Sequence, residues 1–301
     1  SAKYIEDGDG TDSALSISTT RVGIGVTDPD STLEVNGTVH IGGAITFKDS
    51  VTLISTDTYN LGLGVQAVDA ITSGDYNVGF GGIALSNCTE GNYNVATGHA
   101  ALYNTTTGSF NVASGYAALH ANTTGGNNVA IGYTALYTNT TGGNNTAIGT
   151  NALLSNTTAD SNTAVGYNCL DANTTGYSNT AVGLSSMTNN TTGVNTTAVG
   201  FKTLFENTTG SYNLAMCNHA LYNNTTGGNN VALGYYTMQS NTTGEKNTAT
   251  GVQSLFSNTT GDFNVANGYQ ALYNNTTANN NVAVGQIALY SNTTGASNVA
   301  I

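Results

Sequence analysis

Two carboxylates in the repetitive part of the chain have the spacing that paired acid–base chemistry would need. Glu245 and Asp262 lie 17 residues apart and take the same place in adjacent repeat units. A solenoid that cleaves polysaccharides would need carboxyl groups clustered on neighbouring coils. Both residues fall in a predicted turn, however, where a solvated acid is the simpler interpretation. We therefore expect no catalytic site and no enzyme activity.

Other candidate chemical groups are scattered. Three acids near the start lack the spacing and the closing Glu of a calcium loop and are interpreted as an acidic linker: Asp7, Asp9 and Asp12. The four histidines share no spacing with carboxylates, and so they predict neither a metal site nor a triad: His40, His99, His120 and His219. The three cysteines occupy three different places in the repeat, which indicates free thiols: Cys88, Cys169 and Cys217. We expect no metal and no cofactor.

Asn-Thr-Thr recurs at one place in the repeat and matches the acceptor for N-linked glycans. In a eukaryotic secreted fibril this would mean a sugar coat, whereas in other settings it would be merely a turn. The candidate acceptors are Asn122, Asn139, Asn156, Asn173, Asn190, Asn207, Asn224, Asn241, Asn258, Asn275 and Asn292.

These residues belong to a repeat of 17 residues whose landmark is Asn-x-Ala-x-Gly. The landmark begins at Asn77 and returns, without insertion or deletion, through 13 full units to Asn298. Ordinary surface loops tolerate length changes, so strict spacing indicates that each unit stacks on the next. The repeat therefore predicts an elongated, structural part of the molecule.

The unit at 128–144 shows what one repeat can form. Its first five residues alternate, with Val129 and Ile131 facing away from the small residues, and so predict a strand with both faces buried. The segment around Leu136 fits either a second short strand or one helical turn, with a weak preference for the helical turn. Asn139 to Gly142 predicts the turn that returns the chain. The structural positions of the repeat are Asn128, Ala130, Gly132, Leu136, Asn139 and Gly142.

Stacking would place equivalent strands about 4.8 Å apart and align identical residues in columns, including an Asn ladder. Each unit offers roughly 4 to 8 kcal/mol of apolar burial. Ordering its backbone costs about 1 to 2 kcal/mol per residue. Because this core is thin, we expect several copies to wind about one axis, most simply as a homotrimer.

Charge and composition restrict the partners further. Charged residues make up only 7% of the chain, and the net charge is -12, with eleven of the 17 acids before Asn77. Five basic residues leave no nucleic-acid footprint. No apolar run approaches a membrane span. The chain begins at Ser1 and stops inside a unit at Ile301, so we expect further segments at both ends.

The front of the chain lacks the 17-residue period. Residues 16–25 predict a strand, and Asn36-Gly37 predicts a hairpin between 32–37 and 38–42. We therefore divide the chain into an N-terminal β-rich attachment or junction module at 1–60, a transition at 61–76 and a repeat shaft at 77–301.

Two stretches resemble bacteriophage tail fibres. One is Arg21-Val-Gly-Ile-Gly-Val-Thr-Asp-Pro-Asp-Ser-Thr-Leu-Glu-Val-Asn-Gly37, and the other is the array Asn-x-Ala-x-Gly-x-x-Ala-Leu-x-x-Asn-Thr-Thr-Gly across 77–301. The Asn-x-Ala-x-Gly core is also similar to the head repeats of trimeric autotransporter adhesins, which form parallel β-rolls but have a shorter repeat. The resemblance implies a mainly all-β, parallel β-solenoid or β-roll in a homotrimer, exposed on a virion.

The expected function is thus the shaft of a virion tail fibre that presents a host-recognition tip. Its partners would be further copies of itself, neighbouring fibre or baseplate proteins, and a host surface glycan or protein bound by a part outside this sequence. The alternative is a cellular surface fibril or adhesin, glycosylated on the Asn-Thr-Thr turns. Surface Tyr and Phe residues could also contact sugars, although packing between coils or chains is the simpler interpretation.

Overall fold

The computed structural model describes residues 3–6, 12–17, 22–24, 33–35 and 59–301. The chain divides into two units, Ser1–Leu53 and Ile54–Ile301, which are considered separately below.

The first unit contains a four-stranded sheet in the order β1-β2-β3-β4. Its strands are β1 (Lys3–Glu6), β2 (Asp12–Ile17), β3 (Val22–Ile24) and β4 (Leu33–Val35). The prediction of one strand over 16–25 is wrong, because β2 and β3 pair in antiparallel fashion with Leu15 opposite Ile24, so the chain reverses between them. Strand β4 runs parallel to β3. The predicted hairpin around Asn36-Gly37 lies outside the described residues.

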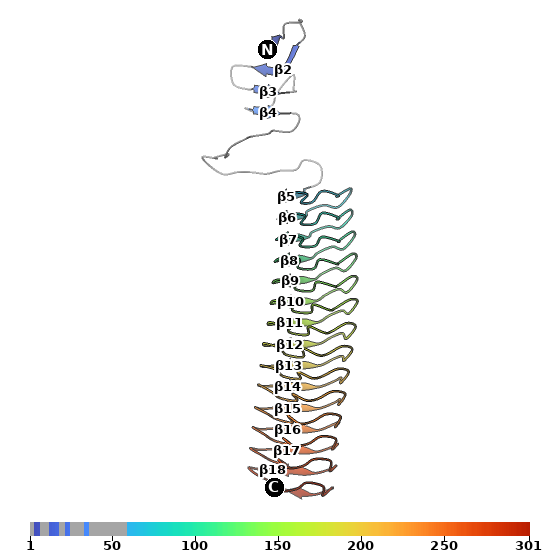
Figure 1. The fold of residues 1–301 in the computed structure, drawn as a ribbon, viewed down its shortest axis with the longest axis vertical. Helices are drawn as coiled ribbons and strands as arrows, with labels where there is room; N and C mark the ends of the chain where they lie inside the picture. Colours follow the sequence, from blue (N-terminus) through green and yellow to red (C-terminus); the bar gives the residue numbers. More distant parts are fainter. Residues whose placement is uncertain (1–2, 7–11, 18–21, 25–32, 36–58) are drawn as a thin grey trace. The chain divides into compact units, whose positions relative to one another are not determined.

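The second unit is a parallel β-solenoid, drawn in Figure 1 as strands stacked in chain order. Its sheet has 15 strands that pair in parallel with their neighbours in chain order, so the end strands β5 and β19 have one partner each. They are β5 (Leu61–Leu63), β6 (Val78–Phe80), β7 (Val95–Thr97), β8 (Val112–Ser114), β9 (Val129–Ile131), β10 (Thr146–Ile148), β11 (Thr163–Val165), β12 (Thr180–Val182), β13 (Thr197–Val199), β14 (Leu214–Met216), β15 (Val231–Leu233), β16 (Thr248–Thr250), β17 (Val265–Asn267), β18 (Val282–Val284) and β19 (Val299–Ala300).

The register of this sheet equals the sequence repeat. Ala147 pairs with Ala130 on one side and with Ala164 on the other, a step of 17 residues each time. The predicted all-β solenoid is thereby confirmed, with about 14 rungs of 17 residues and no helix among the residues that the structure describes. The sheet starts with β5, because Leu61 pairs with Val78; residues 61–76 thus form a rung like the others.

We number positions within a rung from 1, the Asn of the landmark, to 17. Position 9 holds the Leu column, with Met at two rungs and Val68 at the first, and its side chains from Leu85 to Leu272 are the largest that are fully buried. Position 3 holds Ala and position 8 a small residue, and both columns are buried against the Leu column in one continuous core. One large side chain flanked by small ones is all that the narrow interior accommodates.

The backbone around Leu136 is left-handed rather than helical. Thr134 has φ 51°, Leu136 has φ 55°, and Asn144 at the end of the rung has φ 58°. The amide of Leu136 donates to the carbonyl of Ala152 in the next rung at 2.9 Å. The preference for a helical turn is therefore wrong, because a right-handed helix needs negative φ and bonds within its own segment.

Gly132 ends the strand in a conformation that side chains rarely adopt. Its φ is 135°, and a Cβ atom there would lie 2.5 Å from the carbonyl oxygen of Gly149 in the next rung. Each rung therefore approaches its neighbour too closely for a side chain at position 5. Cys217 is the exception in this column, with φ 88°.

Candidate assembly surface

The first polar feature of the interior is an Asn column at position 1. The backbone N–H of Asn145 donates to Oδ1 of Asn128 in the rung before, at 2.9 Å. The Nδ2 group of Asn128 donates to the carbonyl oxygen of Gly142, also at 2.9 Å. These side chains are fully buried. Each buried side-chain amide thus links its own rung to the one after it, which satisfies the requirement that buried polar groups be hydrogen-bonded.

A second Asn column runs at position 12 and meets the first. Nδ2 of Asn139 donates to Oδ1 of Asn122 at 3.0 Å and to the same Gly142 carbonyl at 2.9 Å. One carbonyl per rung therefore accepts from both columns. The structure accordingly brings Asn128, Asn139 and Gly142 together, while Ala130 and Leu136 line the apolar part of the interior.

The burial of position 12 bears directly on glycosylation. Ten of the candidate acceptors, from Asn122 to Asn275, are fully buried, and Asn292 in the last rung is half-buried. Along the column each Nδ2 group donates within the solenoid, as the two bonds of Asn139 illustrate. A glycan on this nitrogen would replace an N–H and would need space that the interior lacks. The folded solenoid therefore excludes glycans at the ten buried positions.

The outward side of the sheet is the most unusual surface of the second unit. From β6 to β18 the central residue of each strand is buried while its neighbours point outward, as in β9, where Ile131 is 41% exposed. We call positions 2 and 4, together with the flanking positions 17 and 6, the outer strand face. The prediction that both faces of the strand are buried is wrong within residues 59–301, where no other segment covers side chains such as Ile131 on this side.

Aromatic residues extend this face in columns. The first column, at position 17, runs through Tyr59, Tyr76, Tyr93 and Phe110, with ring centroids about 5 Å apart and nearly parallel planes. Neighbouring rings cover each other's faces, so mainly ring edges remain accessible within the column. Because sugars stack on ring faces, this arrangement favours packing over sugar binding.

Histidines join the aromatic columns instead of forming a polar site. His99 stacks on Tyr116, and His120 lies between Tyr103 and Tyr137. Burial lowers the pKa of His120, which favours its neutral form. Within residues 59–301 and the described strands of the first unit, no group of three or more His, Cys, Asp or Glu is arranged to hold a metal ion.

The acidic pair is part of the stacking pattern. Oδ1 of Asp262 accepts a hydrogen bond from the backbone N–H of Glu245 at 2.7 Å. Oδ1 of Asp160 accepts in the same way from the backbone N–H of Gly143, six rungs earlier. Asp160 and Asp262 thus each cap a backbone amide of the preceding rung, whereas Glu245 takes part in its pair only through its backbone N–H.

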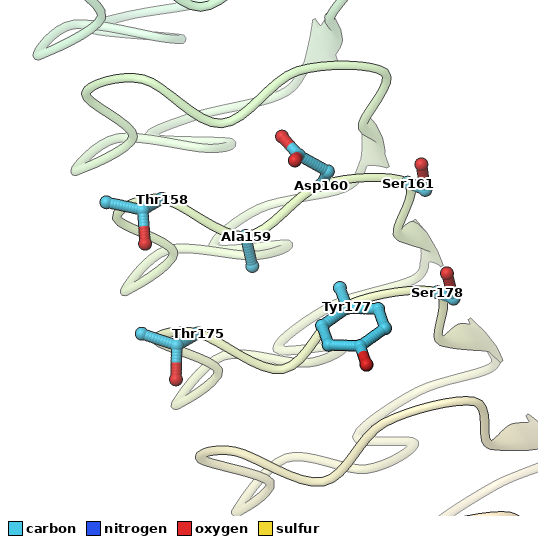
Figure 2. Close-up of a pocket in the computed structure, with 7 residues that line it drawn as sticks. All are labelled: Thr158, Ala159, Asp160, Ser161, Thr175, Tyr177 and Ser178. Atoms are coloured by element: carbon cyan, nitrogen blue, oxygen red, sulfur yellow. The ribbon is translucent and has the colours of Figure 1, made fainter.

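A shallow cavity of about 320 Å³ lies beside Asp160, between two successive rungs. Figure 2 shows its lining, which is formed by Thr158, Ala159, Asp160, Ser161, Thr175, Tyr177 and Ser178. Asp160 is the one acidic side chain among them, and its Oδ1 already accepts from Gly143. The lining offers hydroxyl groups and a single carboxylate, which is insufficient for paired acid–base chemistry.

The cysteines are placed as separate thiols. Cys88 and Cys169 are buried and Cys217 is exposed. Burial raises the pKa of Cys169 to about 12, so its thiol stays protonated at neutral pH. Cys88 fills an interior position where later rungs carry Asn.

Sequence reasoning identified the columns but missed which side of the strand lacks cover. The signal was present in the printed sequence, because positions 17 and 6 next to the strand carry Tyr and Phe in many rungs. Large aromatic residues beside a strand of Val and Ile indicate a face that is apolar but not enclosed by its own chain.

Comparison with known proteins found no protein-family model, no curated protein and no solved structure that matches the chain. Among the described residues, no helix is long and apolar enough to span a membrane. The assignment of function therefore depends on the repeat and on the surface of the solenoid.

Proposed function

We propose that this chain is a shaft segment of a virion tail fibre and acts as a homotrimer that holds a host-recognition tip away from the particle. The observation that carries the proposal is the unbroken 15-stranded parallel sheet, which makes the second unit an extended rod. A rod built by one short repeat is suited to spacing two attachment points. The cavity beside Asp160 is lined by a single carboxylate, which favours a structural role over paired acid–base chemistry there.

The composition of the rod supports a structural role in an extracellular setting. Asn, Thr and Gly supply most of its polar surface, and six acids and two lysines are spread over residues 77–301. Backbone hydrogen bonds join rung to rung along the solenoid, and the two Asn columns add side-chain bonds between rungs, the column at position 12 from Asn122 onward. Such a rod resists bending through many short, repeated bonds rather than through a thick core.

The glycosylated cellular fibril is the less favoured alternative. This alternative predicts an N-linked glycan on the Asn of each Asn-Thr-Thr turn. The Nδ2 groups of these Asn residues are buried from Asn122 to Asn275, which leaves no room for a glycan in the folded rungs. An unglycosylated cell-surface fibril remains the competing assignment that an experiment has to separate from the virion fibre.

The test is localisation by electron microscopy with an antibody raised against the whole chain. If the proposal is correct, gold label decorates thin fibres that project from particles bearing a capsid. Label confined to filaments on cells, with no decorated particles in the same preparation, would overturn the virion assignment and favour a cellular fibril.

A further inference from the structure

We propose that copies of this chain pack through the outer strand face, in parallel and in axial register, with these faces turned toward a shared long axis. This inference rests on the proposed homo-oligomeric shaft and names the surface that holds it together. Its occupant is a further copy of the same chain.

The distribution of exposed apolar side chains identifies the face. In residues 59–301, all large exposed hydrophobic side chains but three belong to positions 17, 2, 4 and 6; the exceptions are Tyr177, Ile287 and Tyr290. The positions of the Asn-Thr-Thr segment contribute none of them. One side of the rod therefore carries nearly all of its exposed apolar side chains, interspersed with uncharged Thr, Ser and Asn, and the side formed by Asn-Thr-Thr is polar. Contiguous apolar surface of this kind marks an interaction site.

Charge favours identical copies as the partner. Across the same four positions of residues 59–301, His99 and Lys246 are the only basic side chains, and there is no acidic one. In a parallel, in-register assembly each residue faces its own equivalent, so a charged column would repel itself. Lys246 lies with its Nζ 4.9 Å from the ring centroid of Phe263 in its own chain. The face is thus compatible with self-association.

The available area is large enough for a stable interface. Fifteen strands spaced about 4.8 Å apart give a face on the order of 65 Å long. A strip about five extended residues wide, at about 3.3 Å per residue, then covers roughly 1,000 Å². Stable interfaces bury roughly 800 Å² on each partner. A second solenoid has the same rise per rung, so its side chains can interdigitate along the entire length.

The axial register between two copies needs a further determinant. Every rung has the same backbone, so one copy could shift along the other by one rung without a backbone clash. Position 2 supplies it by changing composition along the rod. It carries Val in four successive rungs and Thr in the next four: Val78, Val95, Val112 and Val129, then Thr146, Thr163, Thr180 and Thr197. In register, Thr faces Thr. A slip buries Thr hydroxyls against methyl groups, at a cost of about 1 to 3 kcal/mol for each unpaired hydroxyl.

Site-directed cross-linking tests the face and the direction of packing together. The background is Cys217→Gly, which restores the Gly of its column and leaves only the two buried cysteines. Ile131→Cys then places a single thiol on the outer strand face, and Thr141→Cys places a matched thiol on the polar side, where Thr141 is exposed. Both variants are treated with a short bismaleimide, and their masses are measured by sedimentation in parallel.

We expect Ile131→Cys to cross-link between chains, with at least a tenfold higher yield than Thr141→Cys. Cross-linking of residue 131 to its own equivalent requires parallel copies in register, since an antiparallel pair would place residue 131 far from its equivalent. If the chain is oligomeric by sedimentation but only Thr141→Cys cross-links, the proposed face is wrong and the oligomeric shaft stands. If the uncross-linked protein sediments as a monomer, the oligomeric shaft fails as well.

A pair of charge variants gives a second readout. Ile131→Glu with Ile148→Glu puts carboxylates on the face, and Thr141→Glu with Thr158→Glu puts the same charges on the polar side. The first pair should lower the oligomer mass or raise the concentration needed for assembly at least tenfold, while the second pair leaves both unchanged. Equal effects of the two pairs would contradict the proposal.

Discussion

At the scale of single residues, the solenoid depends on buried side-chain amides. The Asn side chains at positions 1 and 12 both donate to one carbonyl oxygen of their own rung. At position 1 the side-chain oxygen also accepts from the backbone N–H of the next Asn in the column. At position 12 the side-chain nitrogen also donates to the side-chain oxygen of the preceding Asn. An isolated buried amide is costly. Here the repeat itself supplies its partners, so Asn can occupy an interior position in rung after rung. A substitution in one rung consequently affects the neighbouring rung too.

Thr105→Asn should stabilise the protein by about 1 to 2 kcal/mol. Thr105 occupies position 12 ahead of the Asn column, and its buried hydroxyl has no hydrogen-bond partner. Asn at this position would accept from Asn122 and extend the column by one rung. The measurement is the midpoint of chemical denaturation. Asn139→Thr is the matched reverse change and should destabilise by a similar amount; an unchanged midpoint in both variants would refute the role of the column.

The buried thiols should be inert while the protein is folded. In a Cys217→Gly background, neither Cys88 nor Cys169 should react with a disulfide reagent at pH 8, and both should react in denaturant. Burial raises the pKa of both thiols, to about 12 for Cys169, and the thiolate is the reactive form. Rapid reaction of either cysteine under native conditions would mean that the core around it opens readily.

Asp171 should make stability depend on pH. Burial raises the pKa of this carboxyl group, and its Oδ1 is buried without a partner. The folded state therefore favours the protonated acid: the cost is absent below the unfolded pKa and appears as pH rises through the folded pKa. Asp171→Asn should raise the melting temperature at pH 7. The gain in the free energy of unfolding should be less than about 1 kcal/mol, because the carboxyl group is partly exposed. The increase should vanish at pH 3, and an equal increase at both values would exclude charge as the cause.

At the scale of one rung, the sequence predicted the strand but not the corner that follows it. The alternation around Ala130 fixes which side chains face inward, because a strand has a period of two. The corner at Leu136 could not be predicted in this way, since the sign of φ at a single Leu leaves no mark on hydrophobic periodicity. The sequence predicts Asn139 as a turn residue but does not indicate that its side chain is buried. Its recurrence as Asn rather than Gly was the signal for a buried amide.

Position 5 sets the closest approach between rungs. Gly132→Ala should destabilise by more than about 2 kcal/mol, because its Cβ would overlap the backbone of the next rung in a conformation that favours Gly. Thermal unfolding followed by circular dichroism measures this effect.

Cys217→Gly replaces the one side chain in this Gly column and should raise the melting temperature. Tolerance of Ala at 132 would show that neighbouring rungs are less tightly stacked than described.

At the scale of the whole solenoid, the exact period of 17 residues was sufficient to predict a stacked, all-β rod. The period fixes the parallel register, as Thr163 opposite Thr180 illustrates. The exposure of the outer strand face could not be predicted from the sequence of one chain. Apolar residues on both faces of a strand indicate that both faces are buried, but not whether the same chain or another copy buries them. Ile148 and Met216 lie on the same side as Ile131 and are similarly exposed. The rungs are therefore hydrogen-bonded to one another within one chain, while the outer strand face stays exposed.

The most direct test of this account is the molecular mass of the purified full chain in solution, measured by sedimentation equilibrium at micromolar concentration. A shaft whose copies cover each other's apolar sides should give three times the chain mass of 30.6 kDa. A single, well-folded species of 30.6 kDa with the circular dichroism of a β-solenoid would contradict it.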